Sequence, residues 1–210
     1  MCRKGRLVSG LFLGFFSLTG CGQIVSDDLP IVLLEFPFAD PSQIMRMAAF
    51  NTPDWGEPGV FHNGIDLIID TYDHPQMWAE PVQIIAPAGG VIREIRVDVN
   101  PYCDQEHAIF GIIISVNRDM TAILALEPLL GEGETHDDQL SLIVVGEMDR
   151  VSVGDEIAGL LDGKEQYSHL HYMLEYKGEI VSPYDYSTQA AKDIFDAISE
   201  RTGEPVNYAP

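Results

Sequence analysis

The stretch SHLHYMLE at residues 168–175 decides what kind of fold and site this chain can form. In a strand, successive side chains point to opposite faces of the sheet. His169 and His171 would therefore share one face, while Leu170 and Tyr172 would point the other way. Two imidazoles on one face, one residue apart, can converge on a single ion or water molecule.

A second segment, FHNGID at residues 61–66, offers further ligand atoms through His62 and Asp66. A zinc hydrolase holds its metal with three protein ligands and leaves the fourth position to water. His62, Asp66 and one of the two paired histidines supply that number of ligands. The two segments together predict a metal site, provided that the fold brings them into contact.

These motifs resemble those of the lysostaphin-type (LytM-like) zinc endopeptidases, which cut peptidoglycan and whose signature is His-x3-Asp followed by His-x-His. Three further segments resemble parts of the same family in the same order. They are the apolar stretch and glycine turn at residues 85–91, the turn at residues 153–159 and the ending at residues 178–183. The resemblance covers roughly residues 46–186.

The resemblance implies a role for each residue of the two motifs. Zinc would be held by His62, Asp66 and His171, and His169 would be the catalytic histidine that does not bind the metal. Bound zinc lowers the pKa of a water molecule and polarises the substrate carbonyl. A nearby histidine can act as a general base or hydrogen-bond the oxyanion.

One position departs from the family pattern. The family has another catalytic histidine, in a Tyr-x-His-Leu pattern on the strand before the second glycine turn, and here that strand reads ILALEPL at residues 123–129. Ala125 stands where the histidine is expected and Ile123 where the tyrosine is expected. A positioned acid–base group contributes about 10²–10⁴ in rate, so this departure predicts slow hydrolysis or its loss. His107 and His136 are the candidates to replace the histidine from loops.

Three functions stay open on these grounds. The first is a lipid-anchored zinc endopeptidase that cuts stem peptides or cross-bridges of peptidoglycan, favoured by the three intact ligands and His169. The second, favoured by Ala125, is a catalytically impaired module that keeps its metal and binds the cell wall or activates a partner amidase. The third is a metal-dependent hydrolase with another peptide or amide substrate.

Short β-branched runs divided by glycine and proline predict an all-β domain, an antiparallel β-sandwich or partly open barrel. The resemblance implies the duplicated hybrid motif type of that class. The expected strands are at residues 31–36, 65–69, 82–85, 91–97, 109–116, 121–126, 142–145 and 157–161, besides the histidine strand.

Two helices and one long loop complete the expected fold. Ser42 could cap a short helix over residues 43–50, and an acidic loop is expected near residues 131–138. A C-terminal helix is expected from a cap at Ser187 to Arg201, because the residues between show helical apolar spacing and Gly203 follows.

The first residues predict a lipoprotein signal. A basic start and an apolar run of about twelve residues end in Leu18-Thr19-Gly20-Cys21, which resembles a bacterial lipobox. Cys21 would then be diacylated and anchor the chain to a membrane. Residue 22 is a glycine and not the aspartate that marks retention at the inner membrane, so we expect attachment to the outer membrane, facing the periplasm. A plain cleaved signal is the alternative. The expected parts are 1–20 signal peptide, 21–45 tether and N-terminal extension, 46–186 peptidase domain, and 187–210 C-terminal helix and tail.

Charge and cysteine content exclude some partners. The formal net charge is −21, and removing the first twenty residues leaves about −24. Such a surface repels nucleic acid and anionic lipid headgroups, so membrane attachment must come from the lipid anchor. With Cys2 in the signal and Cys21 lipidated, Cys103 has no intramolecular partner and no disulfide framework is expected.

Overall fold

The computed structural model describes residues 31–55, 58–70, 78, 80–99, 108–130, 133, 135–162 and 167–209. The expectations for the signal peptide, the lipidated Cys21, Cys103 and His107 lie outside these residues. Within the described part of the chain, no helix combines the length and apolar character that crossing a membrane would need.

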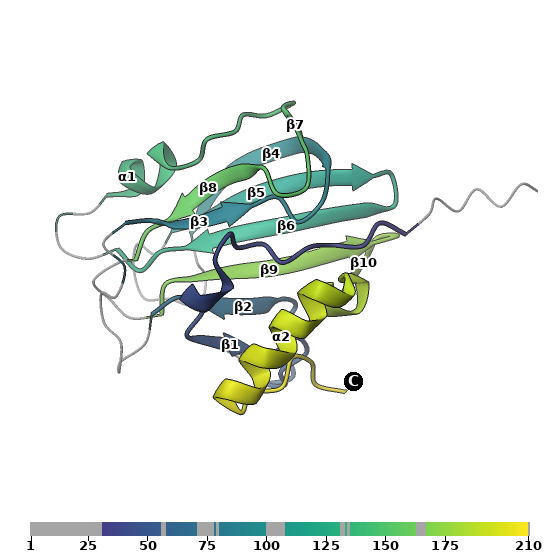
Figure 1. Ribbon diagram of the computed structural model, residues 1–210. Helices are drawn as coiled ribbons and strands as arrows, with labels where there is room; N and C mark the ends of the chain where they lie inside the picture. The colour runs from purple at the N-terminus through teal and green to yellow at the C-terminus, as the bar shows by residue number, and fades with distance from the viewer. Residues whose placement is uncertain are drawn as a thin grey trace, which may run out of the picture.

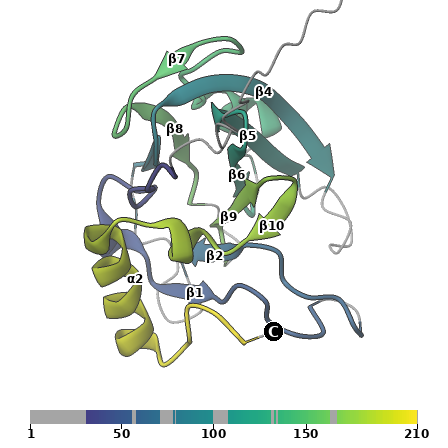
Figure 2. The same ribbon diagram turned by 90° about the vertical axis from the view of Figure 1, so that its right-hand side faces the viewer.

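The chain folds around one large antiparallel sheet with the strand order β1-β2-β9-β6-β5-β4-β7. Figure 1 shows β9 between β2 and β6, and Figure 2 shows how strongly the sheet curves towards β4. The strands of this path are β1 (Arg46–Ala48), β2 (Ile65–Ile68), β4 (Gly90–Val99), β5 (Ala108–Asn117), β6 (Met120–Glu127), β7 (Arg150–Val151) and β9 (His169–Tyr176). The short β10 (Glu179–Val181) also pairs with β9. The predicted antiparallel all-β class is confirmed, and the sheet does not close into a barrel within the described residues.

A second, two-stranded sheet pairs β3 (Val82–Ile85) with β8 (Glu156–Leu160). The two glycine turns that precede β4 and β8 lie against each other, because Gly154 N–H donates to the Ala86 carbonyl at 2.9 Å and Ala86 N–H donates to the Asp155 carbonyl at 2.8 Å. Gly154 has a φ of +84°, a conformation that glycine adopts without steric cost.

Strand β9 separates the core from the histidine face, as its alternation predicts. Leu170 and Tyr172 are fully buried among the core side chains. His169 and His171 lie on the opposite face and keep part of their surface exposed. Along one edge, β9 pairs with β2 through its first half and with β10 through its second half. Strand β6 pairs along the other edge, so β9 is held in register on both sides at the two histidines.

The helix predicted over residues 43–50 is wrong. Residues Pro41–Gln43 form a 3-10 turn (η1), and residues Arg46–Ala48 form β1, which pairs with β2. Met45 N–H donates to the Ile68 carbonyl at 2.8 Å at the start of this pairing. Ile44 and Met47 are both fully buried, so the apolar spacing that suggested a helix face arises instead from a short edge strand.

Three other local expectations also differ from the structure. Residues 31–36 contain a single bridge, Leu34 to Ser187, and residues 142–145 contain a single bridge, Ile143 to Ala158, in place of strands. The expected acidic loop ends in a short helix, α1 (His136–Ser141). Thr135 begins this helix with a capping box: its side chain accepts from Asp138 N–H, and the Asp138 carboxylate accepts from Thr135 N–H.

The C-terminal helix is confirmed as α2 (Gln189–Thr202), with Thr188 rather than Ser187 as its N-cap and Gly203 ending it at a φ of +74°. It follows the 3-10 turn η2 (Pro183–Tyr186). Phe195 is fully buried, and its ring meets that of Phe36 at 4.9 Å between centroids. The helix packs beside β1 (Figure 1).

Candidate metal centre and cleft

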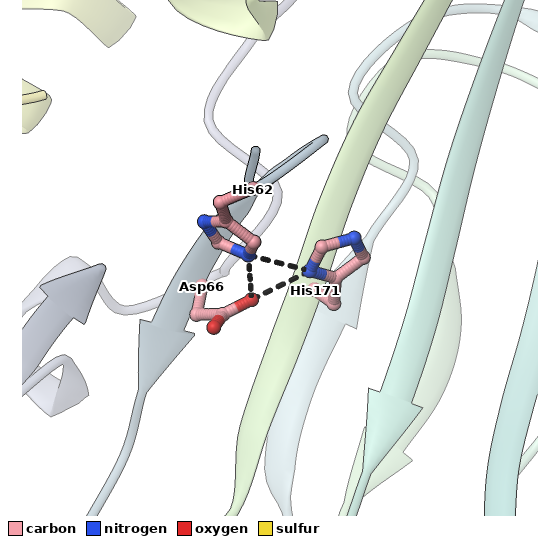
Figure 3. Close-up of side chains that lie close together, drawn as sticks. All are labelled: His62, Asp66 and His171. Atoms are coloured by element: carbon pink, nitrogen blue, oxygen red, sulfur yellow. Dashed lines mark hydrogen bonds and ion pairs between the residues drawn. The ribbon is translucent and has the colours of Figure 1, made fainter. Parts of the chain in front are cut away.

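The pairing of β2 with β9 brings the two motifs together. Asp66 lies directly opposite His171 in the antiparallel register, and residues paired in this way have Cβ atoms about 5 Å apart. His62 lies on the segment that leads into β2, four residues before Asp66. Figure 3 shows the three side chains pointing toward one another from these two parts of the chain.

Their ligand atoms form a small triangle. His62 Nε2 lies 3.1 Å from Asp66 Oδ1 and 3.2 Å from His171 Nδ1, and Asp66 Oδ1 lies 2.6 Å from His171 Nδ1. His62 and Asp66 are almost completely buried, and His171 opens toward solvent. One oxygen and two nitrogens therefore converge on a single point at the edge of the protein surface.

The other nitrogen of each ring is held by an oxygen atom. His62 Nδ1 lies 2.7 Å from the Ala49 carbonyl, and His171 Nε2 lies 3.1 Å from Asn63 Oδ1. Because a carbonyl oxygen can only accept, these ring nitrogens carry the protons and donate them. The lone pairs of His62 Nε2 and His171 Nδ1 are thus free to face the centre of the triangle, as in metal sites whose histidines are oriented by an outer acceptor.

Gly64 allows His171 to sit this close to the loop. A Cβ at position 64 would lie 2.6 Å from His171 Cε1 and 2.9 Å from the Tyr172 carbonyl oxygen. Such a contact requires backbone or the ligand ring to shift, so a glycine between His62 and Asp66 is a geometric requirement of the site.

The charge of Asp66 fits a metal ligand. Burial alone would raise the pKa of this carboxyl, but a protonated His169 and the close ring nitrogens of His171 and His62 outweigh burial and hold its pKa well below the usual range. Asp66 is therefore an anion at neutral pH, in the form that binds a divalent cation.

His169 stands beside the triangle without belonging to it. Its Nδ1 donates to the Tyr167 carbonyl at 2.8 Å, so in the neutral ring the Nε2 lone pair faces the cleft. Nε2 lies 3.9 Å from Asp66 Oδ1 and 3.6 Å from Glu127 Oε2. Burial alone would lower the pKa of His169, but these two carboxylates and the Tyr167 carbonyl raise it.

The structure places Ala125 directly opposite His171 on β6, so the expected histidine position does adjoin the triangle. The next residue on the same face is Glu127, which lies directly opposite His169 and is 9% exposed. The sequence interpretation missed Glu127. Strand alternation offered the signal, because a residue two positions after Ala125 must share its face.

Of the two histidines proposed as replacements, His136 does not fill that gap. His136 lies at the start of α1 and packs edge-on against the Phe110 ring, 5.9 Å between centroids. Phe110 belongs to the buried core, whereas its neighbour Ile109 lines the cleft. His107 lies outside the described residues.

The three ligand atoms lie beside a cleft of about 420 Å³. It is lined by Trp55, Val60, Phe61, Asn63, Asp66, Arg96, Asp98, Ile109, Ala125, Glu127, His169, His171 and Met173. Trp55 forms one wall by stacking on His62, with ring centroids 4.1 Å apart and planes 24° apart.

The donor set fits zinc. Two neutral imidazoles and one carboxylate are ligands that zinc accepts, and three protein ligands leave a position open toward the cleft. His62 Nε2 and His171 Nδ1 lie 3.2 Å apart, and the protons of both rings are on the outer nitrogens. Two lone pairs therefore face each other, and a cation between them would accept both. Within the described residues, this is the one group of His, Cys, Asp or Glu side chains arranged to hold a metal ion.

No protein-family model matches the sequence, and no curated protein matches it. Several solved structures are similar to it, among them the following three. A zinc-containing peptidase from Vibrio cholerae is 17% identical, with 71% of this chain and 38% of that chain covered and a TM-score of 0.46. A Pseudomonas aeruginosa protein assigned to peptidase M23 is 17% identical, covering 72% and 54%, with a TM-score of 0.40. A point mutant of the catalytic domain of the prophage-encoded M23 protein EnpA from Enterococcus faecalis is 18% identical, covering 74% and 98%, with a TM-score of 0.44.

The aligned part of this chain thus spans 38% and 54% of the length of the first two structures. All three TM-scores lie below 0.5, so the function has to be inferred from the residues of the cleft.

Proposed function

We propose that the protein is a zinc peptidase that hydrolyses peptide bonds of peptidoglycan. One observation carries the proposal: the side chains of His62, Asp66 and His171 converge on one point, with their ligand atoms within 4.8 Å of one another. The order and spacing of these residues resemble the lysostaphin-type motifs, which is the support for a peptidoglycan substrate.

Zinc held there would activate a water molecule and polarise the scissile carbonyl. His169 is placed to move the protons. Its unprotonated Nε2 can accept a proton from the attacking water as the new C–O bond forms, and it can return that proton to the leaving amine as the C–N bond breaks. Glu127, 3.6 Å away, stabilises the imidazolium between these two transfers.

Glu127 offers a reason why Ala125 need not abolish catalysis. The carboxylate occupies the next position of the same strand face, beside His169 instead of beside His171. A charged partner for His169 is therefore present although the second histidine is absent.

We also propose that the mature chain is lipid-anchored through Cys21 in the cell envelope, at the outer membrane and facing the periplasm. The basic start, the apolar run and the Leu18–Cys21 segment support this proposal. Tethering near the wall would raise the local concentration of substrate.

The alternative is a catalytically impaired module that binds the wall or activates a partner amidase, and Ala125 favours it. Ala125→His separates the two. A large gain of hydrolysis would show that the native cleft lacks only an acid–base group, whereas no gain would show that the cleft has changed further.

The direct test uses purified mature protein loaded with zinc and incubated with peptidoglycan of several chemical types, with release of soluble fragments followed by mass spectrometry. We expect fragments cut at peptide bonds, and none with His169→Ala. If the folded, zinc-bound wild-type protein released no fragments from any type, the peptidase proposal would be lost and the binding module would remain.

A further inference from the structure

Arg96 reaches the cleft from β4, three strands away from His171. The strand register places Asp66, His171, Ala125, Gly111 and Arg96 in one row across the sheet. Directly paired residues share a face of the sheet, so the whole row faces the cleft. Ala125, which has a single methyl group, lies between the metal ligands and Arg96, and Gly111 has no side chain to keep Arg96 away from the sheet.

The Arg96 side chain lies over Gly111. A Cβ at position 111 would be 3.2 Å from Arg96 Cγ and 3.3 Å from Arg96 Nε. Nε donates to Asp98 Oδ2 at 2.8 Å, which fixes the guanidinium at one edge. The Nη groups carry four further N–H donors in the fork that matches a carboxylate.

The distance from His171 to the Arg96 guanidinium can be compared with the length of an extended peptide. Gly111 lies two strand spacings from His171, or about 10 Å. An extended peptide advances about 3.3–3.6 Å per residue, so this span corresponds to roughly two to three residues. We propose that Arg96 is a carboxylate-binding subsite, which selects peptides with a free carboxylate about two to three residues from the bond held at the metal centre.

The charges of the cleft make this subsite selective. Among the described residues that line the cleft, Arg96 is the one arginine or lysine, while Asp66, Asp98 and Glu127 supply three carboxylates. The sequence as a whole carries a formal charge of −21. A ligand carboxylate beside Glu127 would be repelled, whereas one that reaches Arg96 meets a cation, so the position of the carboxylate along the cleft affects its binding.

This inference rests on the proposed peptidase function, since it names the substrate class of the same cleft. Its test is therefore a binding measurement besides an activity measurement. The probes are two synthetic peptidoglycan stem peptides, identical except that the free carboxylates of one are primary amides in the other. Calorimetry with the zinc-loaded mature protein gives the affinity for each peptide, and mass spectrometry follows their hydrolysis.

We expect the free-acid peptide to bind roughly tenfold more tightly than the amide, as for a charged hydrogen bond in a partly exposed site. Arg96→Gln should abolish this preference, and Arg96→Lys should restore part of it because the charge returns without the fork. Asp98→Asn should strengthen it, because the guanidinium loses its competing anion. Arg93→Gln is the matched control, since Arg93 is exposed on the same strand and does not line the cleft.

Equal affinity of the wild-type protein for both peptides, binding of neither, or an acid preference that survives Arg96→Gln would overturn the inference. A preference for the acid without any hydrolysis would support the subsite and remove the peptidase. Equal binding with hydrolysis of both peptides would support the peptidase and remove the subsite.

Discussion

Glu127→Gln tests whether the carboxylate beside His169 takes part in hydrolysis. The substitution keeps the size of the side chain and removes its charge, and its amide N–H can donate to the Nε2 lone pair that should accept a proton. At the observed 3.6 Å, and with an effective dielectric constant of 20, the attraction between Glu127 and a protonated His169 has an upper limit of about 4.6 kcal/mol. Both side chains keep some exposure, so we expect a smaller effect, a fall of roughly 10²–10³ in kcat with KM changed less than about threefold.

The assay is the steady-state release of peptidoglycan fragments by zinc-loaded protein over a range of pH. Glu175→Gln is the control, because Glu175 is a partly buried carboxylate on the same face of β9 that does not line the cleft. Glu127→Asp should recover part of the rate. Adding Ala125→His to Glu127→Gln should also recover part of it, because an imidazole then returns to the row beside His171. A Glu127→Gln protein that binds zinc and keeps kcat within about threefold of wild type would refute this reasoning.

Three further predictions concern the site and the fold. Asn63→Ala removes the oxygen that accepts from His171 Nε2 and should weaken zinc binding by about 10–100-fold in a chelator competition. Unchanged zinc affinity would mean that Asn63 does not orient His171. Burial is the main cause that raises the pKa of Asp70 to about 7, and the neighbouring carboxyl of Asp162 is the second. Between about pH 4 and 7 the native state therefore holds a proton that the unfolded state has lost, so the free energy of unfolding falls as the pH rises through this range. Asp70→Asn has no proton to lose, so it should be about 1–2 kcal/mol more stable than wild type at pH 8, after allowance for partial solvation and the proton shared with Asp162. At pH 4 the two proteins should be equally stable, and urea titrations at the two pH values measure the difference. Phe195→Ala empties a fully buried position against Phe36, and should cost about 3–5 kcal/mol in a urea titration; a loss below about 1 kcal/mol would mean that α2 does not belong to the core.

The site could be predicted from the sequence to the extent that local rules determine it. Strand alternation alone places His169 and His171 on one face, and the structure has this arrangement. The contact between His171 and Asp66 depends on the register of two strands about a hundred residues apart. The alternation of side chains within one strand does not determine how that strand aligns with another. The contact between His171 and Asp66 was therefore expected from the family resemblance and not from the sequence of either strand alone.

The segment at residues 43–50 differs from its expected structure because a tertiary contact overrides a local pattern. Ile44 and Met47 have a spacing compatible with a helix, yet pairing with β2 makes their segment extended. Strand alternation places Glu127 on the same face as Ala125, but alternation alone does not show which residue lies opposite Glu127. The partner of Glu127 is set by the β6–β9 register, which places it opposite His169.

Zinc content is the measurement that tests the central claim most directly. Purified mature protein dialysed against zinc and then against buffer should retain one zinc ion per chain by mass spectrometry of the metal, and His171→Ala should retain much less than one. His136→Ala, which changes a histidine outside the cleft, should retain the full amount. Folded wild-type protein without zinc at neutral pH, or a His171→Ala variant that binds as much as wild type, would contradict the assignment of His62, Asp66 and His171 as one metal centre.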